Sequence, residues 1–167
     1  MNVKQLETTE KVIGENTFYI RPFPAFVAAG ISGDLAAILS PLLGGVAALL
    51  GDNKENVLDM DAEKALPAIT SAFSTLSGDK VEYLLTKLLI KHENVSVSGP
   101  ATDGETKRLN MDLANEVFCG EVQDMYLLCF EVIRLNFKGF FKKLGDRFGN
   151  LQGILEKVKP STKSTES

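Results

Sequence analysis

The chain has 167 residues, of which 44% are hydrophobic and 24% are charged, and this composition is ordinary for a single soluble domain with a buried core. The formal net charge at pH 7 is −4, so a mainly basic, nucleic-acid-binding protein is excluded and we expect no nucleic acid among its partners.

The charge is distributed unevenly along the chain. Residues 1–133 contain 10 Lys or Arg against 19 Asp or Glu, and residues 134–167 contain 8 against 3. The two parts therefore carry net charges of −9 and +5. An acidic body with a basic end can attract a second copy head to tail, or an acidic partner, and we expect a homo-oligomer.

The N-terminal part is predicted to contain one short strand followed by apolar helix. Residues 1–16 are polar and expected to be loosely held, whereas the alternation in residues 17–22 predicts a strand. A helix is expected over residues 26–39, with a break or kink because Pro41 follows. A second apolar piece then covers residues 42–50.

The middle of the chain predicts two helices and a β-hairpin. Asp61 is expected to cap a helix that extends to about Leu76. The segment Ser77-Gly78-Asp79 ends that helix and caps the next one, over residues 80–91. Residues 93–109 alternate in polarity and contain two turn signals, which predicts a small hairpin.

Two helices are predicted at the C-terminal end. The longer one covers residues 111–136 and is expected to be central, and a Phe-rich helix follows as far as Val158. Residues 159–167 are rich in Ser and Thr and expected to be disordered. The predicted fold is mainly α, with residues 1–158 as one compact domain of about five to six helices, a short N-terminal strand and a small β-hairpin.

An apolar stripe marks the Phe-rich helix. Steps of three, four and seven residues place its members on one helical face, with lysines mainly on the other side. This pattern suits a core face, a membrane-surface helix or a docking face, and the three readings stay open. The residues that we predict as a partner-binding site are Phe137, Phe140, Phe141, Leu144, Phe148 and Leu151.

The sequence contains no clear catalytic or metal-binding arrangement. The single histidine, His92, directly follows a predicted helix and is expected either to stabilise that helix end as a cation or to be exposed. Residues 52–63 resemble a calcium-binding loop at both ends, but Lys54 and Val57 occupy positions that need an oxygen ligand and a glycine. We therefore expect no metal, no cofactor and no enzymatic activity.

The carboxylates and cysteines of the predicted 111–136 helix are also expected to be structural and not catalytic. The carboxylates alternate with apolar positions as an exposed stripe would: Glu116, Glu121, Asp124 and Glu131. Cys119 and Cys129 are expected in that one helix, about 15 Å apart along its axis, which is too far for a disulfide. Buried thiols in a reducing cytoplasm are the expected state.

One uncharged segment is long enough to raise the question of whether it spans a membrane. Residues 35–51 contain no charged side chain, but a span needs about 20 apolar residues. Asp34 and Asp52 flank the segment, and Pro41 lies within it. A kinked, buried helix pair or an oligomer contact is therefore the favoured reading, and we expect a cytoplasmic protein that does not bind a membrane.

Two stretches carry a family resemblance: FYIRPFPAFVAAGISGDLAAILSPLLGGVAALLG (residues 18–51) and EVIRLNFKGFFKKLGDRFG (residues 131–149). In this order and at this spacing they resemble tail assembly chaperones of long-tailed bacteriophages and prophages, especially of Gram-positive hosts. The resemblance implies a non-enzymatic, mostly helical protein that binds the tape-measure protein and keeps it soluble during assembly of the tail tube. It also implies the tape-measure protein as a partner, with the tail tube protein as a second candidate.

Two other functions stay open at this point. The chain can be a minor tail component that remains in the particle, or a membrane-active phage protein. If it is a chaperone, the apolar region of residues 23–50 and the face of residues 137–158 are the surfaces expected to serve self-association and client binding.

Overall fold

The computed structural model describes residues 3–49 and 60–157, except for the side chains of residues 38–49, 141, 142 and 144–157. Five α-helices and a four-stranded sheet make up this part of the chain, together with two short 3-10 helices. The elements are η1 (Lys4–Leu6), β1 (Thr9–Ile13), β2 (Asn16–Ile20), α1 (Ala25–Leu49), α2 (Ala62–Ser74), α3 (Gly78–Leu89), β3 (Val95–Ser98), η3 (Pro100–Thr102), β4 (Lys107–Arg108), α4 (Met111–Val117) and α5 (Val122–Lys157).

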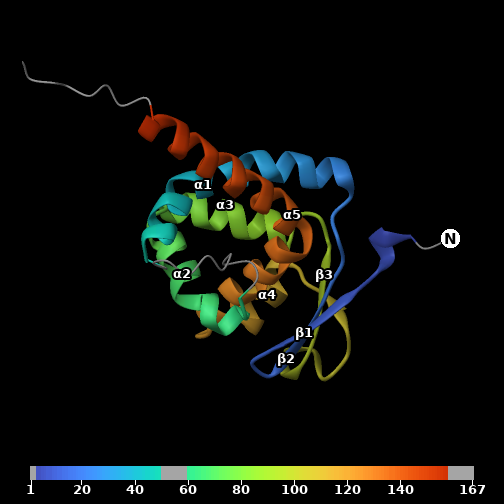
Figure 1. Cartoon of the computed structure of the whole chain (residues 1–167). Helices are drawn as coiled ribbons and strands as arrows, with labels where there is room; N and C mark the ends of the chain where they lie inside the picture. Colours follow the sequence, from blue (N-terminus) through green and yellow to red (C-terminus); the bar gives the residue numbers. More distant parts are fainter. Residues whose placement is uncertain (1–2, 50–59, 158–167) are drawn as a thin grey trace, which may run out of the picture.

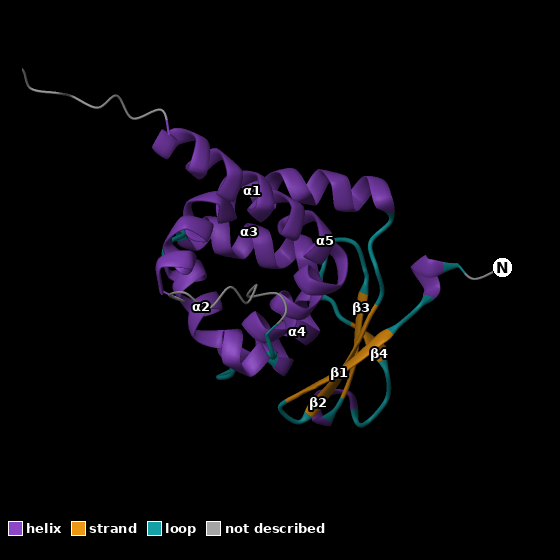
Figure 2. Ribbon diagram, in the orientation of Figure 1, coloured by secondary structure: helices purple, strands orange, loops and turns teal. Residues whose placement is uncertain are grey.

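The sheet is antiparallel, with strand order β1-β2-β3-β4, and lies to one side of the helices (Figure 2). Strand β2 pairs with β3 so that Thr17 is opposite Ser98, although these residues are far apart in sequence. The predicted strand at residues 17–22 and the predicted hairpin at 93–109 are therefore confirmed, and they belong to the same sheet.

Strand β1 corrects the expectation that residues 1–16 are loosely held. It forms a hairpin with β2 through a two-residue turn at Gly14 and Glu15, in which Gly14 has a φ of +60°. Such turns require positive φ, which glycine adopts without strain. The polar composition of this strand hid it, because only one of its faces packs against the body.

The inner face of the sheet forms one wall of the core. Phe18, Ile20, Val95 and Val97 have no exposed surface, and the ring of Phe18 stacks on Phe118 with ring centroids 5.6 Å apart. Helix α5 (orange to red in Figure 1) contacts α1, α2, α3 and β1. Its buried residues belong to the same core as those of the sheet. The expectation of a mainly α fold with a β-hairpin agrees with this architecture.

Helix α1 is continuous from Ala25 to Leu49, so the expected division into residues 26–39 and 42–50 is wrong. A proline inside a helix removes one backbone hydrogen bond and clashes with the preceding turn, at a cost of about 3 kcal/mol. The backbone nevertheless stays helical through Pro41 as far as Leu49.

The predicted helix over residues 111–136 is also wrong, because the chain breaks inside it. Helix α4 ends at Val117, and Gly120 follows with a φ of +81°, the left-handed conformation that commonly ends helices. Helix α5 then runs without interruption into the Phe-rich segment. Cys119 consequently lies exposed in the turn, and only Cys129 is the buried thiol that we expected.

Two expectations concern the ends and the membrane. The expected disordered tail at residues 159–167 lies outside the described residues, as does most of the acidic loop at residues 52–63. Among the helices of the described part, none combines the length with the hydropathy that crossing a bilayer requires.

Candidate partner-binding surfaces

The structure separates the six residues that we predicted as a partner-binding site. Phe137 is 2% exposed, and its ring centroid is 6.3 Å from that of Phe23, so it contributes to the core. Phe140, one helical turn later, is 39% exposed. The other four side chains lie outside the description: Phe141, Leu144, Phe148 and Leu151. A docking role for the part of this face beyond Phe137 stays a prediction.

The most exposed large apolar side chain of the described residues is on a different element, α1. Phe26, in the first turn of that helix, is 95% exposed. Further along, Ile31 and Leu35 are fully buried, which orients the opposite side of α1 toward solvent. Among residues 25–37, the part of α1 whose side chains are described, the other exposed residues are all small: Ala25, Ala29, Gly30, Gly33 and Ala37.

This outward side, which we call the α1 face, consists of Phe26 and these small residues. A helix that is apolar all round is usually buried all round. The described elements cover only one side of α1 here, so the other side suits a partner that supplies apolar cover. Sequence reasoning identified the region of residues 23–50 but not Phe26, since Phe23, which is 5% exposed, fits the same apolar pattern.

A charged cluster attaches α1 to α3. The Tyr83 hydroxyl donates a hydrogen bond to Asp34 Oδ2 at 3.2 Å, and Lys87 pairs with the same carboxylate. The hydrogen bond from Lys87 lowers the pKa of Asp34 below its usual range, and the same contact raises the pKa of Lys87. Both groups are therefore charged at neutral pH, and they hold α1 on α3.

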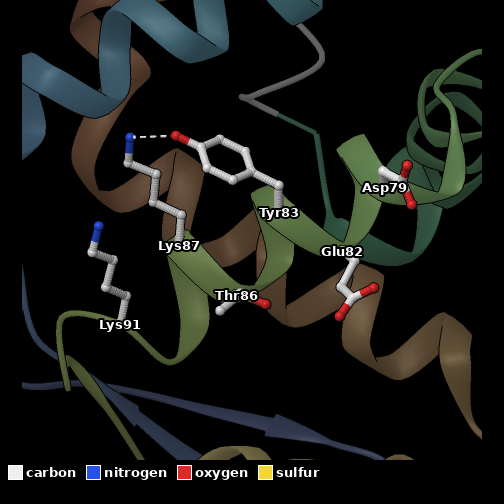
Figure 3. Close-up of a pocket in the computed structure, with 6 residues that line it drawn as sticks. All are labelled: Asp79, Glu82, Tyr83, Thr86, Lys87 and Lys91. Carbon is white, nitrogen blue, oxygen red and sulfur yellow. Dashed lines mark hydrogen bonds between the residues drawn. The ribbon is translucent and has the colours of Figure 1, made fainter.

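The outward side of α3 is hollowed, with a volume of about 420 Å³. Figure 3 shows two acidic side chains toward the N-terminal end of the helix and two lysines toward its C-terminal end, with an aromatic and a hydroxyl group between them. These residues form what we call the α3 row: Asp79, Glu82, Tyr83, Thr86, Lys87 and Lys91. The row contains no cysteine or histidine, and its chemistry suits polar contact with a partner.

Metal binding has no support in the geometry of the described residues. Among the side chains that the structure describes, no group of three or more His, Cys, Asp or Glu is placed to hold an ion.

Glu131 contradicts the expectation of an exposed carboxylate stripe. Its side chain is 6% exposed and accepts hydrogen bonds from Arg134 Nη2 at 2.6 Å, while Lys11 Nζ on β1 is 3.5 Å away. Arg134 also donates to the backbone oxygen of Met60 at 3.0 Å. Glu131 thus joins the N-terminal hairpin, α5 and the start of α2, which is a structural role.

The remaining carboxylates of that set differ among themselves. Glu116 and Glu121 are exposed, as expected. Asp124 is half-buried, and burial raises its pKa, with a further contribution from the charge of Glu121.

His92 is neither exposed nor a helix-capping cation, so both expectations for it are wrong. It is half-buried and packs edge-on against Phe23 with ring centroids 5.7 Å apart. Burial lowers its pKa, and the charges of Lys91 and Lys87 lower it further. Both effects favour the neutral imidazole. Because α3 already ends at Leu89, His92 lies beyond the last turn of the helix and packs against Phe23 instead.

Comparison with known proteins gives one family match. The family model described as phage tail assembly chaperone protein, TAC, matches residues 14–149, a range from the β1–β2 turn into the distal part of α5. This range includes both stretches that carried the resemblance, together with the whole region between them. No curated protein and no solved structure matches the chain.

Proposed function

The chain belongs to the phage tail assembly chaperone family, and on that premise we propose that it binds the tape-measure protein and keeps it soluble while the tail tube is assembled. We also propose that it acts without catalysis, in the cytoplasm of the bacterial host, and that several copies act on one client. The tail tube protein is the second candidate partner in this scheme.

The observation that carries this proposal is the α1 face. A holdase for a long helical client requires apolar surface that is exposed on the folded chaperone yet does not unfold it. Phe26 meets this requirement because its side chain is 95% exposed and contributes little to the core. The neighbouring small residues allow a client helix to approach α1 closely.

Weak apolar contacts, repeated over many copies of the chaperone, also explain how the client can be released. Each apolar contact is weak alone, but many copies bound along one client hold it with high avidity. The same contacts can be displaced one at a time as tube subunits polymerise. No nucleotide or other source of chemical energy is needed for such a mechanism.

Co-expression with the tape-measure protein encoded nearby tests the proposal. We expect the tape-measure protein to be insoluble alone and to co-elute with this chain in size-exclusion chromatography with light scattering. Phe26→Ser is expected to raise the dissociation constant for each bound copy by about tenfold or more, since exposed aromatic anchors dominate interface energies. Its thermal unfolding should be nearly unchanged, because an exposed side chain adds little to stability.

The matched control is Val12→Ser, which removes another exposed apolar side chain, 71% exposed, from the outer side of the sheet. We expect this variant to bind the client as the unsubstituted protein does. If the tape-measure protein stays insoluble in the presence of the chain, the client assignment fails. If the complex forms but Phe26→Ser behaves like Val12→Ser, the family role stands and the α1 face is not the client site.

A further inference from the structure

We propose that the α3 row is a self-complementary surface through which two copies of this chain pair about a two-fold axis. The row is acidic at one end, with Asp79 and Glu82, and basic at the other, with Lys87 and Lys91 (Figure 3). This inference names an interface for self-association and does not depend on the identity of the client.

The charges of the row are available for a partner. Among the ion pairs between described residues, none involves Asp79, Glu82 or Lys91, whereas Lys87 is held by Asp34. All three of those side chains are exposed. Three charges of the row, two at its acidic end and one at its basic end, thus have no partner within the described fold.

The arrangement of these charges selects a second copy over a uniformly charged partner. An acidic or a basic partner is attracted at one end of the row and repelled at the other. An antiparallel copy of α3 meets opposite charge at both ends. With the two-fold axis through the middle of the row, the acidic end of each copy, with Glu82, lies over the basic end of the other, with Lys91. Symmetry makes each pair occur twice.

Tyr83 gives the centre of this surface a fixed aromatic group. Its side chain is 52% exposed, yet its hydroxyl is held by Asp34 at 3.2 Å and by Lys87 Nζ at 3.0 Å. An exposed ring that is already immobilised loses little conformational entropy on binding. Tyrosine is also among the residues enriched in the buried centres of protein interfaces.

Charge reversal in the full-length protein tests this pairing. We expect light scattering over a concentration series to show a dimer that Glu82→Lys and Lys91→Glu each weaken by roughly tenfold or more, because each change places two like-charged pairs in contact. The control is Glu105→Lys, which makes the same charge change at an exposed position outside α3.

Mixing the two single variants gives the decisive comparison. The Glu82→Lys variant has lysine at positions 82 and 91, and the Lys91→Glu variant has glutamate at both. These two variants have complementary charges, so their equimolar mixture is expected to form a heterodimer. Circular dichroism spectra should show that each variant is folded. The proposal is overturned if the unsubstituted chain is monomeric throughout, if Glu82→Lys acts no more strongly than Glu105→Lys, or if the mixture does not reassociate.

Discussion

At the scale of single residues, the buried carboxylate of Glu131 connects distant parts of the chain. It lies between Arg134 on the same helix and Lys11 on β1, with only 6% of its side chain exposed. A buried charge is tolerated when it is paired and hydrogen-bonded, and removing one member of such a cluster leaves the others uncompensated. The cluster therefore makes the hairpin, α5 and the start of α2 interdependent.

Glu131→Gln is expected to lower the free energy of unfolding by about 2–3 kcal/mol, because Arg134 and Lys11 would face each other without a counter-ion. Denaturant unfolding measures this change. The matched control is Glu93→Gln, which removes an ion pair with Arg108 whose side chains are 66% and 54% exposed. That pair is expected to contribute less than about 0.5 kcal/mol. Equal effects of the two substitutions would contradict a structural role for Glu131.

His92 predicts how stability depends on pH. Its folded-state pKa is lowered by burial and by Lys91 and Lys87, so the unfolded chain binds the proton more tightly than the folded chain. The stabilising contribution is complete above the ordinary pKa of about 6.5 and is lost as the pH falls below it. We expect the free energy of unfolding to decrease between about pH 7 and pH 5. In His92→Gln, this decrease should be absent, and an unchanged slope would contradict the assignment.

At the scale of elements, one glycine in the turn before α5 and another inside α5 are expected to respond oppositely to substitution by alanine. Gly120 has a φ of +81°, and Gly139 lies within α5, while an added Cβ would meet no atom within 4 Å at either position. Gly120→Ala is expected to cost about 1 kcal/mol, since alanine disfavours the left-handed conformation. Gly139→Ala is expected to add roughly 0.5–1 kcal/mol of stability in the helix. Thermal unfolding should show midpoint shifts of opposite sign, and shifts of the same sign would contradict the boundary at Gly120.

The elements that could be predicted from the sequence are those with local signals. Helices α2 and α3 agree with their expected bounds to within a few residues, because apolar periodicity and cap-type residues in the sequence mark them, although the side chains of Asp61 and Ser77 at their N-caps make no capping hydrogen bond. Turn signals mark the 93–109 hairpin. Strand β1 could not be predicted, since it depends on pairing with β2 and on the contact between Lys11 and Glu131. The break at Gly120 escaped prediction because apolar periodicity continues on both sides of it.

The candidate surfaces were harder to predict for a related reason. Phe23, Phe26, Ile31 and Leu35 are equally apolar in sequence, and only the packing of α1 against its neighbours decides that Phe26 alone of these is exposed. The same holds for Phe137 and Phe140 on α5, which share a predicted stripe but are 2% and 39% exposed. Periodicity identifies an amphipathic or apolar helix, but tertiary contacts decide which side remains open.

At the scale of the whole molecule, the earliest and latest segments meet repeatedly. The backbone N–H of Phe23 donates to Asn136 Oδ1 at 2.8 Å, and Lys11 pairs with Glu131. Strand β2 pairs with β3, which places Thr17 opposite Ser98. The sheet and α5 therefore depend on contacts between residues far apart in sequence, and such contacts slow folding.

These long-range contacts have a consequence for synthesis on the ribosome. Translation at about 5–20 residues per second leaves the β1–β2 hairpin waiting on the order of ten seconds for Asn136 to emerge. An isolated two-stranded hairpin is marginal in water, so the nascent chain has no stable sheet at least until β3 emerges at residues 95–98. The ordered fold, and with it the orientation of α1, is acquired only when the part of α5 that contains Glu131 and Asn136 has left the exit tunnel.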